Sequence, residues 1–122
     1  MKFREFVTKS GAKIIWGKDA ESNEELMEKF KGKPNTVLHT VAPGSPFCVI
    51  EAKNPSQEDV SLSASICSRY SQDWRDNKSD VKVNVFRGKD VYKTEDMPTG
   101  TFGVKKSRII IVKKKEILKI LR

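Results

Sequence analysis

The side chains that could do chemistry in this sequence gather in its first half. His39 is the only histidine, and Asp19, Asn23 and Ser45 are the polar groups that could act with it. A general base needs a tuned pKa and an orienting partner, and a zinc site needs three or four ligands. Because no second histidine and no clustered cysteines are present, we predict no metal site, no cofactor and no catalytic residue. A lone histidine on an apolar strand is more typical of a hydrogen-bonded structural residue, or of a contact with an RNA base or phosphate.

Two glycine-lysine pairs, Gly17-Lys18 and Gly88-Lys89, invite comparison with phosphate-binding loops. Neither pair stands in a Gly-x-x-x-x-Gly-Lys-Ser/Thr frame or in a Gly-x-Gly-x-x-Gly frame. Nucleotide hydrolysis is therefore not predicted. Asp19, beside the first pair, stands near the start of an expected helix, where a short acid serves as a cap or as a ligand group.

The basic charge of the chain is concentrated at one end. Its 122 residues carry a net charge of +8 at pH 7. Residues 105–122 hold eight cations and one acid, a net charge of +7, so the remainder is nearly neutral. Such a field favours a polyanionic partner, although a solvated basic face without a ligand would give the same count. No apolar run approaches the roughly 20 residues that span a bilayer, and we expect a cytoplasmic protein without membrane contact.

Two helices and a set of strands must position these groups. Ser22-Asn23-Glu24-Glu25 matches a capping box with Ser22 as the N-cap of the first helix, which would end before Pro34. The second helix would begin within residues 54–59 and continue to Trp74 along a stripe of mostly small residues.

The remaining segments predict strands. Residues 3–7 and 12–16 indicate a hairpin, and residues 36–41 and 47–52 indicate two adjacent strands joined by a tight loop. Further strands are expected at 81–85, 91–93, 101–104 and 108–113, and residues 114–122 predict a basic tail or a short helix. The fold class is α+β: a single domain over residues 1–122, with a mixed β-sheet and two main helices packed on it.

Two motifs in this frame resemble a known family. Residues 17–26 contain Gly-Lys-Asp-Ala, then Asn-Glu-x-Leu, and residues 38–45 contain Leu-His, then Pro-Gly-Ser. Their order and separation, with further matches over residues 12–113, resemble the NFACT-R domain, the RNA-binding module of ribosome quality-control proteins of the RqcH and NEMF type. Asn35 and Val37 replace the usual Asp and Trp of that family, so the detailed ligand is not carried over.

The resemblance implies a standalone domain that binds structured RNA. Its ligand would be tRNA or ribosomal RNA, and its partners would include the ribosome, in translation or ribosome-associated quality control. The residues that we expect to contact RNA either share one surface or supply its charge: Lys18, Asp19, Asn23, His39, Gly44, Ser45, Arg69, Arg87, Lys89, Lys93, Lys105 and Lys106.

Two other functions fit the same residues. Asp19, Asn23, His39 and Ser45 could form a small RNA-modifying site, in which case His39→Ala would abolish turnover and leave RNA affinity nearly unchanged. A charge-driven, nonspecific nucleic-acid binder would instead show a salt slope of about −0.7 per neutralised phosphate on single strands, with little preference between RNA and DNA.

Overall fold

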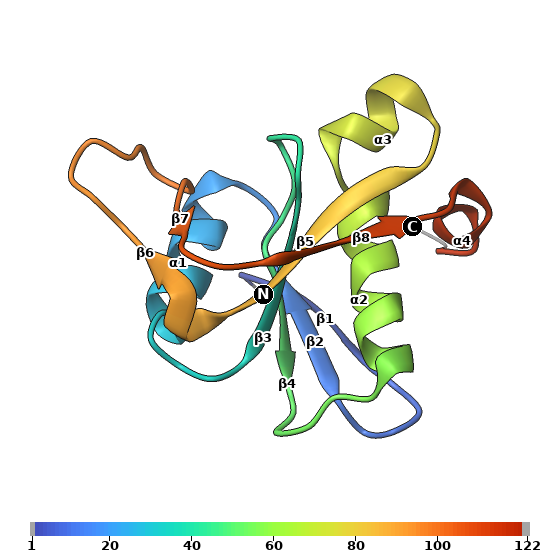
Figure 1. Cartoon of the computed structure of the whole chain (residues 1–122), viewed down its shortest axis with the longest axis horizontal. Helices are drawn as coiled ribbons and strands as arrows, with labels where there is room; N and C mark the ends of the chain where they lie inside the picture. The colour runs from blue at the N-terminus through green and yellow to red at the C-terminus, as the bar shows by residue number, and fades with distance from the viewer. Residues whose placement is uncertain (1, 121–122) are drawn as a thin grey trace.

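The computed structural model describes residues 2–120, and Figure 1 shows the order of its elements. The helices are α1 (Ala20–Phe30), α2 (Gln57–Arg69), α3 (Gln72–Asn77) and α4 (Lys114–Leu118), with a single 3-10 turn, η1, at Gly88–Asp90. The strands are β1 (Arg4–Val7), β2 (Lys13–Trp16), β3 (Thr36–Thr40), β4 (Cys48–Glu51), β5 (Val81–Arg87), β6 (Val91–Tyr92), β7 (Gly103–Val104) and β8 (Arg108–Val112). The predicted α+β class is confirmed.

The main sheet is antiparallel, and the predicted mixed sheet is wrong. Its six strands follow the order β1-β2-β4-β3-β5-β8, and each of the five pairings described in it is antiparallel. The helical connections do join parallel strands, β2 to β3 through α1 and β4 to β5 through α2 and α3. In each case one antiparallel strand lies between the two, so no parallel strands become neighbours. β6 and β7 form a separate two-stranded sheet.

The two helical connections cover opposite faces of the sheet. Both advance in the same direction across the strand order, while the strands they join run in opposite directions. The right-handed preference of such crossovers therefore places α1 on one face and α2 on the other, as Figure 1 shows. Alternate residues of one strand feed two cores: Ile15 packs with the α1 residues Leu26 and Phe30, whereas Ile14 packs with the α2 residues Ala64 and Cys67.

Helix boundaries differ from the prediction at two places, and a short helix is found where the sequence predicted either a basic tail or a short helix. α1 begins at Ala20, because Asp19 and not Ser22 is its N-cap. The single predicted second helix is two helices, since α2 ends at Arg69 and the Ser71 hydroxyl caps α3 by accepting from the Trp74 N–H. Of the predicted tail, residues 114–118 form α4, and residues 121 and 122 lie outside the described part.

α4 packs against α2 through Ile117, which is fully buried. Within residues 2–120, no helix combines the length and apolar character needed to cross a membrane.

Candidate nucleic-acid interface

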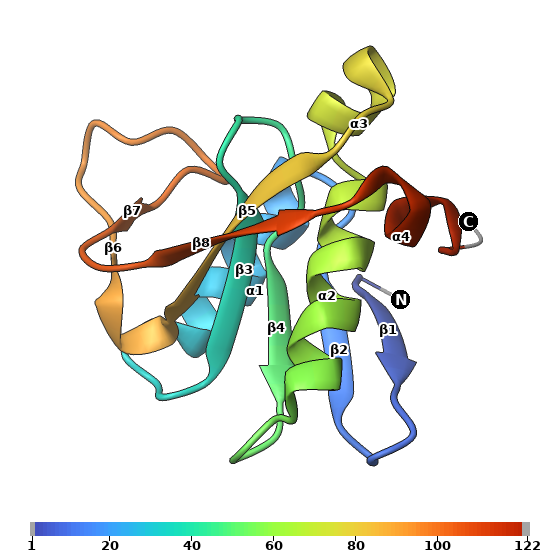
Figure 2. The same cartoon turned by 45° about the vertical axis from the view of Figure 1, so that its right-hand side comes forward.

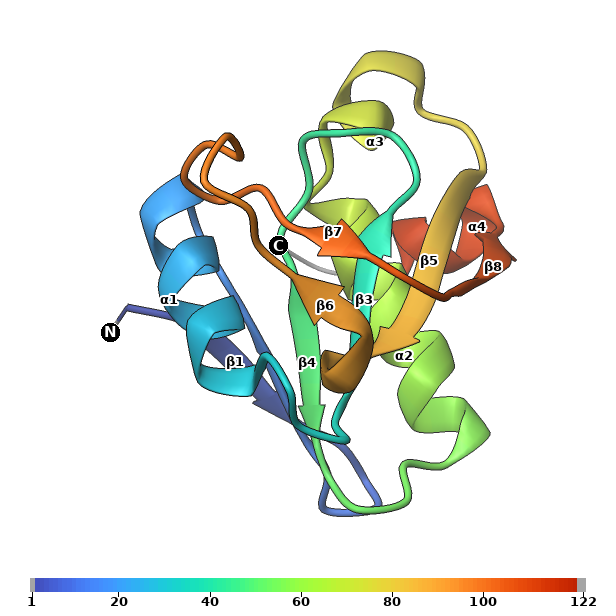
Figure 3. The ribbon, with the colours of Figure 1, turned by 60° about the vertical axis from the view of Figure 1, so that its left-hand side comes forward.

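A cleft of about 730 Å³ opens at the end of the sheet where β2 leaves it and β3 runs into the loop of residues 41–47. Three segments far apart in sequence form most of its wall: residues 17–23, 39–47 and 99–104. Figure 3 shows the loop before β7 reaching over the N-terminal end of α1. Six of the predicted site residues line this cleft: Lys18, Asp19, Asn23, His39, Gly44 and Ser45.

Asn23 joins the two sequence motifs that line the cleft. Its Oδ1 accepts the Phe47 backbone N–H at 3.1 Å, which fixes the end of the 41–47 loop to α1. Gly17 packs directly against this side chain, because a Cβ at Gly17 would lie 2.2 Å from Asn23 Oδ1. The glycine and the asparagine of the first motif are therefore required together, to hold the second motif in place.

Asp19 and Ser45 also have structural partners. The Asp19 carboxylate accepts the Ser22 N–H at 2.8 Å, and this hydrogen bond at the helix start lowers the pKa of Asp19. The Ser45 hydroxyl accepts the Thr40 N–H and donates to the Pro46 carbonyl, both at 3.1 Å. Both groups thus shape the cleft wall, and the Ser45 hydroxyl that we expected to face a phosphate is occupied within the loop.

His39 is the titratable group best placed to meet a ligand. Its Nδ1 lies 2.8 Å from the Thr40 carbonyl, and because a carbonyl only accepts, Nδ1 carries the proton. Burial against Phe47, whose ring centroid lies 4.4 Å away, disfavours the cation, and the pKa of His39 is lowered. Hydrogen bonding with the Thr40 and Ser45 backbone opposes this effect but does not reverse it. The lowered pKa favours the neutral imidazole at pH 7, in which Nε2 has no proton and can accept a hydrogen bond.

Two arginines that the sequence analysis does not single out line the same cleft. Arg4, from β1, places its guanidinium 5.0 Å from the centre of the Tyr70 ring. Arg75, from α3, donates to the Tyr70 carbonyl at 3.3 Å and to Gln72 Oε1 at 2.9 Å. Nothing in the local sequence pattern marks either residue, because the N-terminal hairpin and α3 meet only through the tertiary fold.

The other predicted cations lie elsewhere. Arg69 lines a neighbouring groove that shares Arg4 and Tyr70 with the cleft. Arg87 pairs with Thr36, at the opposite end of β3 from the cleft, and Lys89 follows it in η1. Lys105 and Lys106 are exposed in the turn between β7 and β8. These five cations do not line the cleft.

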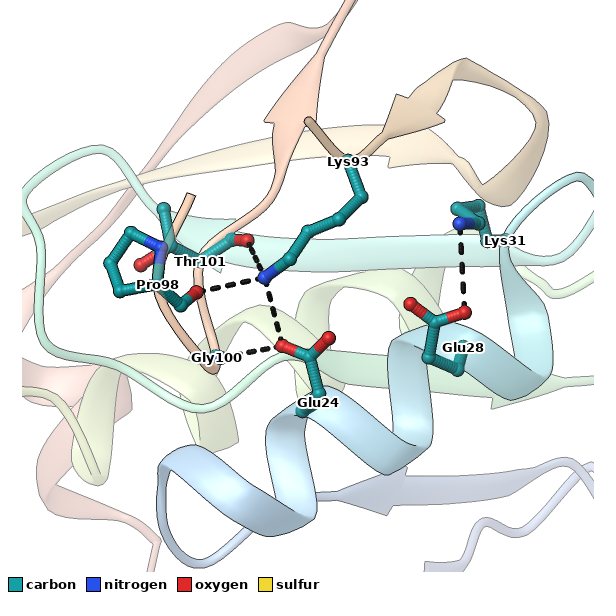
Figure 4. Close-up of polar contacts among 7 residues, drawn as sticks. All are labelled: Glu24, Glu28, Lys31, Lys93, Pro98, Gly100 and Thr101. Carbon is teal, nitrogen blue, oxygen red and sulfur yellow. Dashed lines mark hydrogen bonds and ion pairs between the residues drawn. The ribbon is translucent and has the colours of Figure 1, made fainter. Parts of the chain in front are cut away.

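Lys93 has a structural position that the sequence analysis does not anticipate. Figure 4 shows its ammonium group between Glu24 of α1 and the loop before β7. Nζ lies 2.9 Å from Glu24 Oε1 and 2.8 Å from each of the Pro98 and Thr101 carbonyls, so its three donors all have acceptors within the protein. The Gly100 N–H donates to the same Glu24 oxygen at 2.7 Å.

We call this group of five residues the Lys93 clamp: Glu24, Lys93, Pro98, Gly100 and Thr101. The hydrogen bond from the Gly100 N–H, together with the hydrogen bond and charge of the Lys93 ammonium, lowers the pKa of Glu24. Lys93 also lies 4.4 Å from the centre of the Phe102 ring, which lines the cleft. The clamp therefore positions one wall of the cleft, and it leaves Lys93 little capacity to contact a phosphate.

One protein of similar sequence and one of similar fold match this chain. The chain is 26% identical over 112 residues to ribosome quality control complex subunit 2 of Schizosaccharomyces pombe, a match that covers 85% of this chain and 11% of that protein. The structure of the C-terminal part of the fibronectin/fibrinogen-binding protein from Streptococcus suis superposes with a TM-score of 0.83 at 20% identity. That superposition covers 98% of this chain and 49% of the other. The chain thus spans a small part of the first relative and about half of the second.

A family model settles the relationship. The model described as the NFACT protein RNA binding domain matches residues 2–106, which include every segment of the cleft wall. Since this match covers most of the chain and its two motifs build one cleft, the protein belongs to the NFACT RNA-binding domain family.

Proposed function

We propose that the protein binds structured RNA, a tRNA or a ribosomal RNA, in ribosome-associated quality control or translation in the cytoplasm. The observation that carries this proposal is the cleft, in which the two family motifs meet cations and aromatic rings from β1, α3, β5 and the connecting segments that hold Tyr70 and Phe102. Its volume of about 730 Å³ lies within the usual range of ligand sites. It therefore has room for an unpaired nucleotide.

Each class of side chain in the cleft has a role in that proposal. The cations of Arg4, Lys18 and Arg75 suit phosphate oxygens, which position a nucleic acid without reading its sequence. The rings of Tyr70 and Phe102 offer faces or edges to a base, and base stacking on aromatic side chains is worth about 1–3 kcal/mol.

Neutral His39 adds an acceptor at Nε2 for a base N–H or a ribose 2′-hydroxyl. The hydroxyl exists only in RNA, so this contact would favour RNA over DNA.

The geometry gives less support to an RNA-modifying enzyme. A general base needs an orienting acid or a reacting nucleophile within hydrogen-bond reach. The Asp19 carboxylate is held by the backbone of its own helix, and the Ser45 hydroxyl is held within its loop. His39 Nδ1 is oriented by a carbonyl and not by an acid. This arrangement suits recognition better than proton transfer.

The test is recovery of cellular RNA by two variants that remove the same number of cations. Arg4→Gln/Arg75→Gln changes the cleft, and Arg87→Gln/Lys89→Gln changes the other end of the sheet. RNA retained by each variant and by the wild type at physiological salt is sequenced. We expect the wild type and the Arg87/Lys89 variant to enrich the same tRNA or ribosomal RNA, and the cleft variant to lose that enrichment.

Two results would contradict the proposal. Equal losses in both variants would indicate binding by net charge alone. Recovery of bulk RNA without enrichment by the wild type would indicate that the cleft does not select its ligand.

A further inference from the structure

The outer edge of β8 is open. β8 is the last strand of the main sheet, and within residues 2–120 it pairs only with β5. The Val41 N–H donates to the Lys82 carbonyl at 2.9 Å, so the backbone polar groups of Lys82 face β3. In an antiparallel sheet the backbone N–H and C=O groups of successive residues alternate between the two neighbouring strands, so the backbone groups of Val83 face β8. Ile110, the partner of Val83 on β8, turns its own N–H and C=O toward β5. The N–H and C=O groups of Ile109 and Ile111 therefore point outward, away from β5.

The same two residues expose their side chains. Ile109 is 57% exposed and Ile111 is 56% exposed, and because they are two residues apart they lie on one face of the sheet. Figure 2 shows β8 running in front of the other strands of the sheet. Val41, 45% exposed, extends this apolar strip across Lys82, the partner of Ile111.

Edge strands of soluble proteins are usually protected by charges, prolines or bulges. The other edge of this sheet, β1, follows that rule, since Arg4 and Glu5 occupy half of it. β8 instead reads Arg-Ile-Ile-Ile-Val, with its only charge at the first position. Such a strand is suited to pairing with another extended segment.

The charge around β8 indicates the kind of segment. Lys105, Lys106 and Arg108 lie at its start, and Lys113, Lys114 and Lys115 follow its end. Of these six side chains, only that of Lys113 forms an ion pair in the described part of the chain, with Asp80 at 3.6 Å; the Lys114 backbone N–H donates to the same carboxylate. Lys82 adds a further exposed cation on the face that carries the isoleucines.

We propose that β8 is a docking strand for an extended, acidic segment of a partner protein, which would add a seventh strand to the sheet. The outward amides would pair with its backbone, the isoleucines would pack on its alternate apolar side chains, and the flanking lysines would meet its acids. A second copy of this chain fits poorly, because antiparallel pairing of two β8 strands would place residues 105–108 of each beside residues 113–115 of the other. RNA also fits poorly, because isoleucine provides no stacking surface.

The proposal predicts a specific pattern of amide protection. The probe is a seven-residue peptide of alternating glutamate and valine with blocked ends, added to the full chain at physiological salt. Hydrogen exchange followed by NMR should show fast exchange at Ile109 and Ile111 in the free protein and slow exchange with peptide, while Ile110 is protected in both. A peptide of the same composition with glutamates and valines in two blocks, and one with N-methylated valines, are the controls, and both should protect these amides at least about tenfold less.

Variants separate this surface from the cleft. Ile109→Thr/Ile111→Thr keeps β-branched residues, and we expect it to weaken peptide binding at least about tenfold and to leave RNA binding within about twofold. Phe6→Thr/Val7→Thr, exposed on β1, is the matched control and should change neither.

Three results would overturn the proposal: no protection of Ile109 and Ile111 by the alternating peptide, equal protection by the block peptide, or stronger protection by RNA. Protection that rises with protein concentration alone would assign the edge to a second copy and would also overturn it.

Discussion

Replacement of Lys93 by methionine should destabilise the protein more than loss of an ordinary surface lysine. The Lys93 side chain is only 17% exposed, and its ammonium group makes three hydrogen bonds of 2.8–2.9 Å. A hydrogen bond to a charged group contributes about 1.5–3 kcal/mol. In Lys93→Met, water can hydrogen-bond to the Pro98 and Thr101 carbonyls in place of the ammonium group, which offsets part of the loss. We therefore expect Lys93→Met to lower the free energy of unfolding by about 2–3 kcal/mol.

Lys31→Met is the matched control. Lys31 pairs with Glu28 at 3.5 Å on the exposed side of α1, with side chains 36% and 50% exposed, as Figure 4 also shows. Exposed pairs of this kind contribute at most about 1 kcal/mol. Urea denaturation of both variants compares their free energies of unfolding. In thermal unfolding, the melting temperature should fall by about 10 °C for Lys93→Met and by no more than about 4 °C for Lys31→Met.

The same substitution tests how the cleft is held. Since the Lys93 clamp positions the wall that contains Gly100 and Phe102, Lys93→Met should also weaken RNA binding at a temperature where the variant remains folded. Equal stability losses in the two variants would refute the reasoning on the clamp. A destabilised Lys93→Met protein with unchanged RNA affinity would show that this wall does not contact the ligand.

Three further predictions follow from the same geometry. The pKa of Glu24 is lowered in the folded state, so its contribution to the free energy of unfolding is complete above the ordinary carboxyl pKa and is lost as the pH falls through the lowered value. The difference in the free energy of unfolding between wild type and Glu24→Gln, measured by urea denaturation, should therefore be constant from pH 8 to about 5.5 and shrink below about pH 4.5. The pKa of His39 is also lowered in the folded state, so the unfolded chain binds the proton at a higher pH than the folded protein does. The free energy of unfolding of the wild type, measured by urea denaturation, should therefore fall as the pH decreases below about 6.5, and that of His39→Asn should fall less over the same range. Gly44 has a φ of +92°, and a Cβ there would lie 2.9 Å from Gln72 Cβ, so Gly44→Ala should cost about 2–3 kcal/mol in thermal unfolding. Gly11, with a φ of +91° and open space around it, is its control, and Gly11→Ala should cost only about 1 kcal/mol; equal losses would mean that contact with α3 is unimportant.

The sequence is most informative where structure depends on neighbours in the chain. Two strand-like runs separated by a turn predict the β1-β2 hairpin, and residues 54–59 predict the start of α2, because strand pairing across a short turn and helix capping involve residues a few positions apart. The same local rules misplace the start of α1. Asp19 and Ser22 both suit an N-cap, and the structure uses both: Asp19 occupies the cap position, and the Ser22 hydroxyl accepts a hydrogen bond from the Asp19 backbone N–H.

The two motifs also indicate from sequence which residues meet in the cleft. All six motif residues that we predicted at the site line it. Their spacing does not indicate what each one does: Asn23 holds a backbone N–H 24 residues away, and the Ser45 hydroxyl is occupied within its loop. The roles of the individual cations are predicted less well, because the local sequence around a lysine is the same whether its side chain faces a phosphate or a carboxylate within the protein.

By itself, the sequence determined most of the helices and strands, the α+β class, the family and two of the three segments that form the cleft wall, because these depend on local periodicity, capping and motif residues. Only the tertiary structure decided the strand order, which interleaves two crossovers and leaves β8 at an open edge. It also decided which cations reach the cleft, bringing Arg4 and Arg75 to Tyr70 and directing Lys93 to Glu24, 69 residues away. Such pairings depend on long-range packing, which hydrophobic periodicity does not encode.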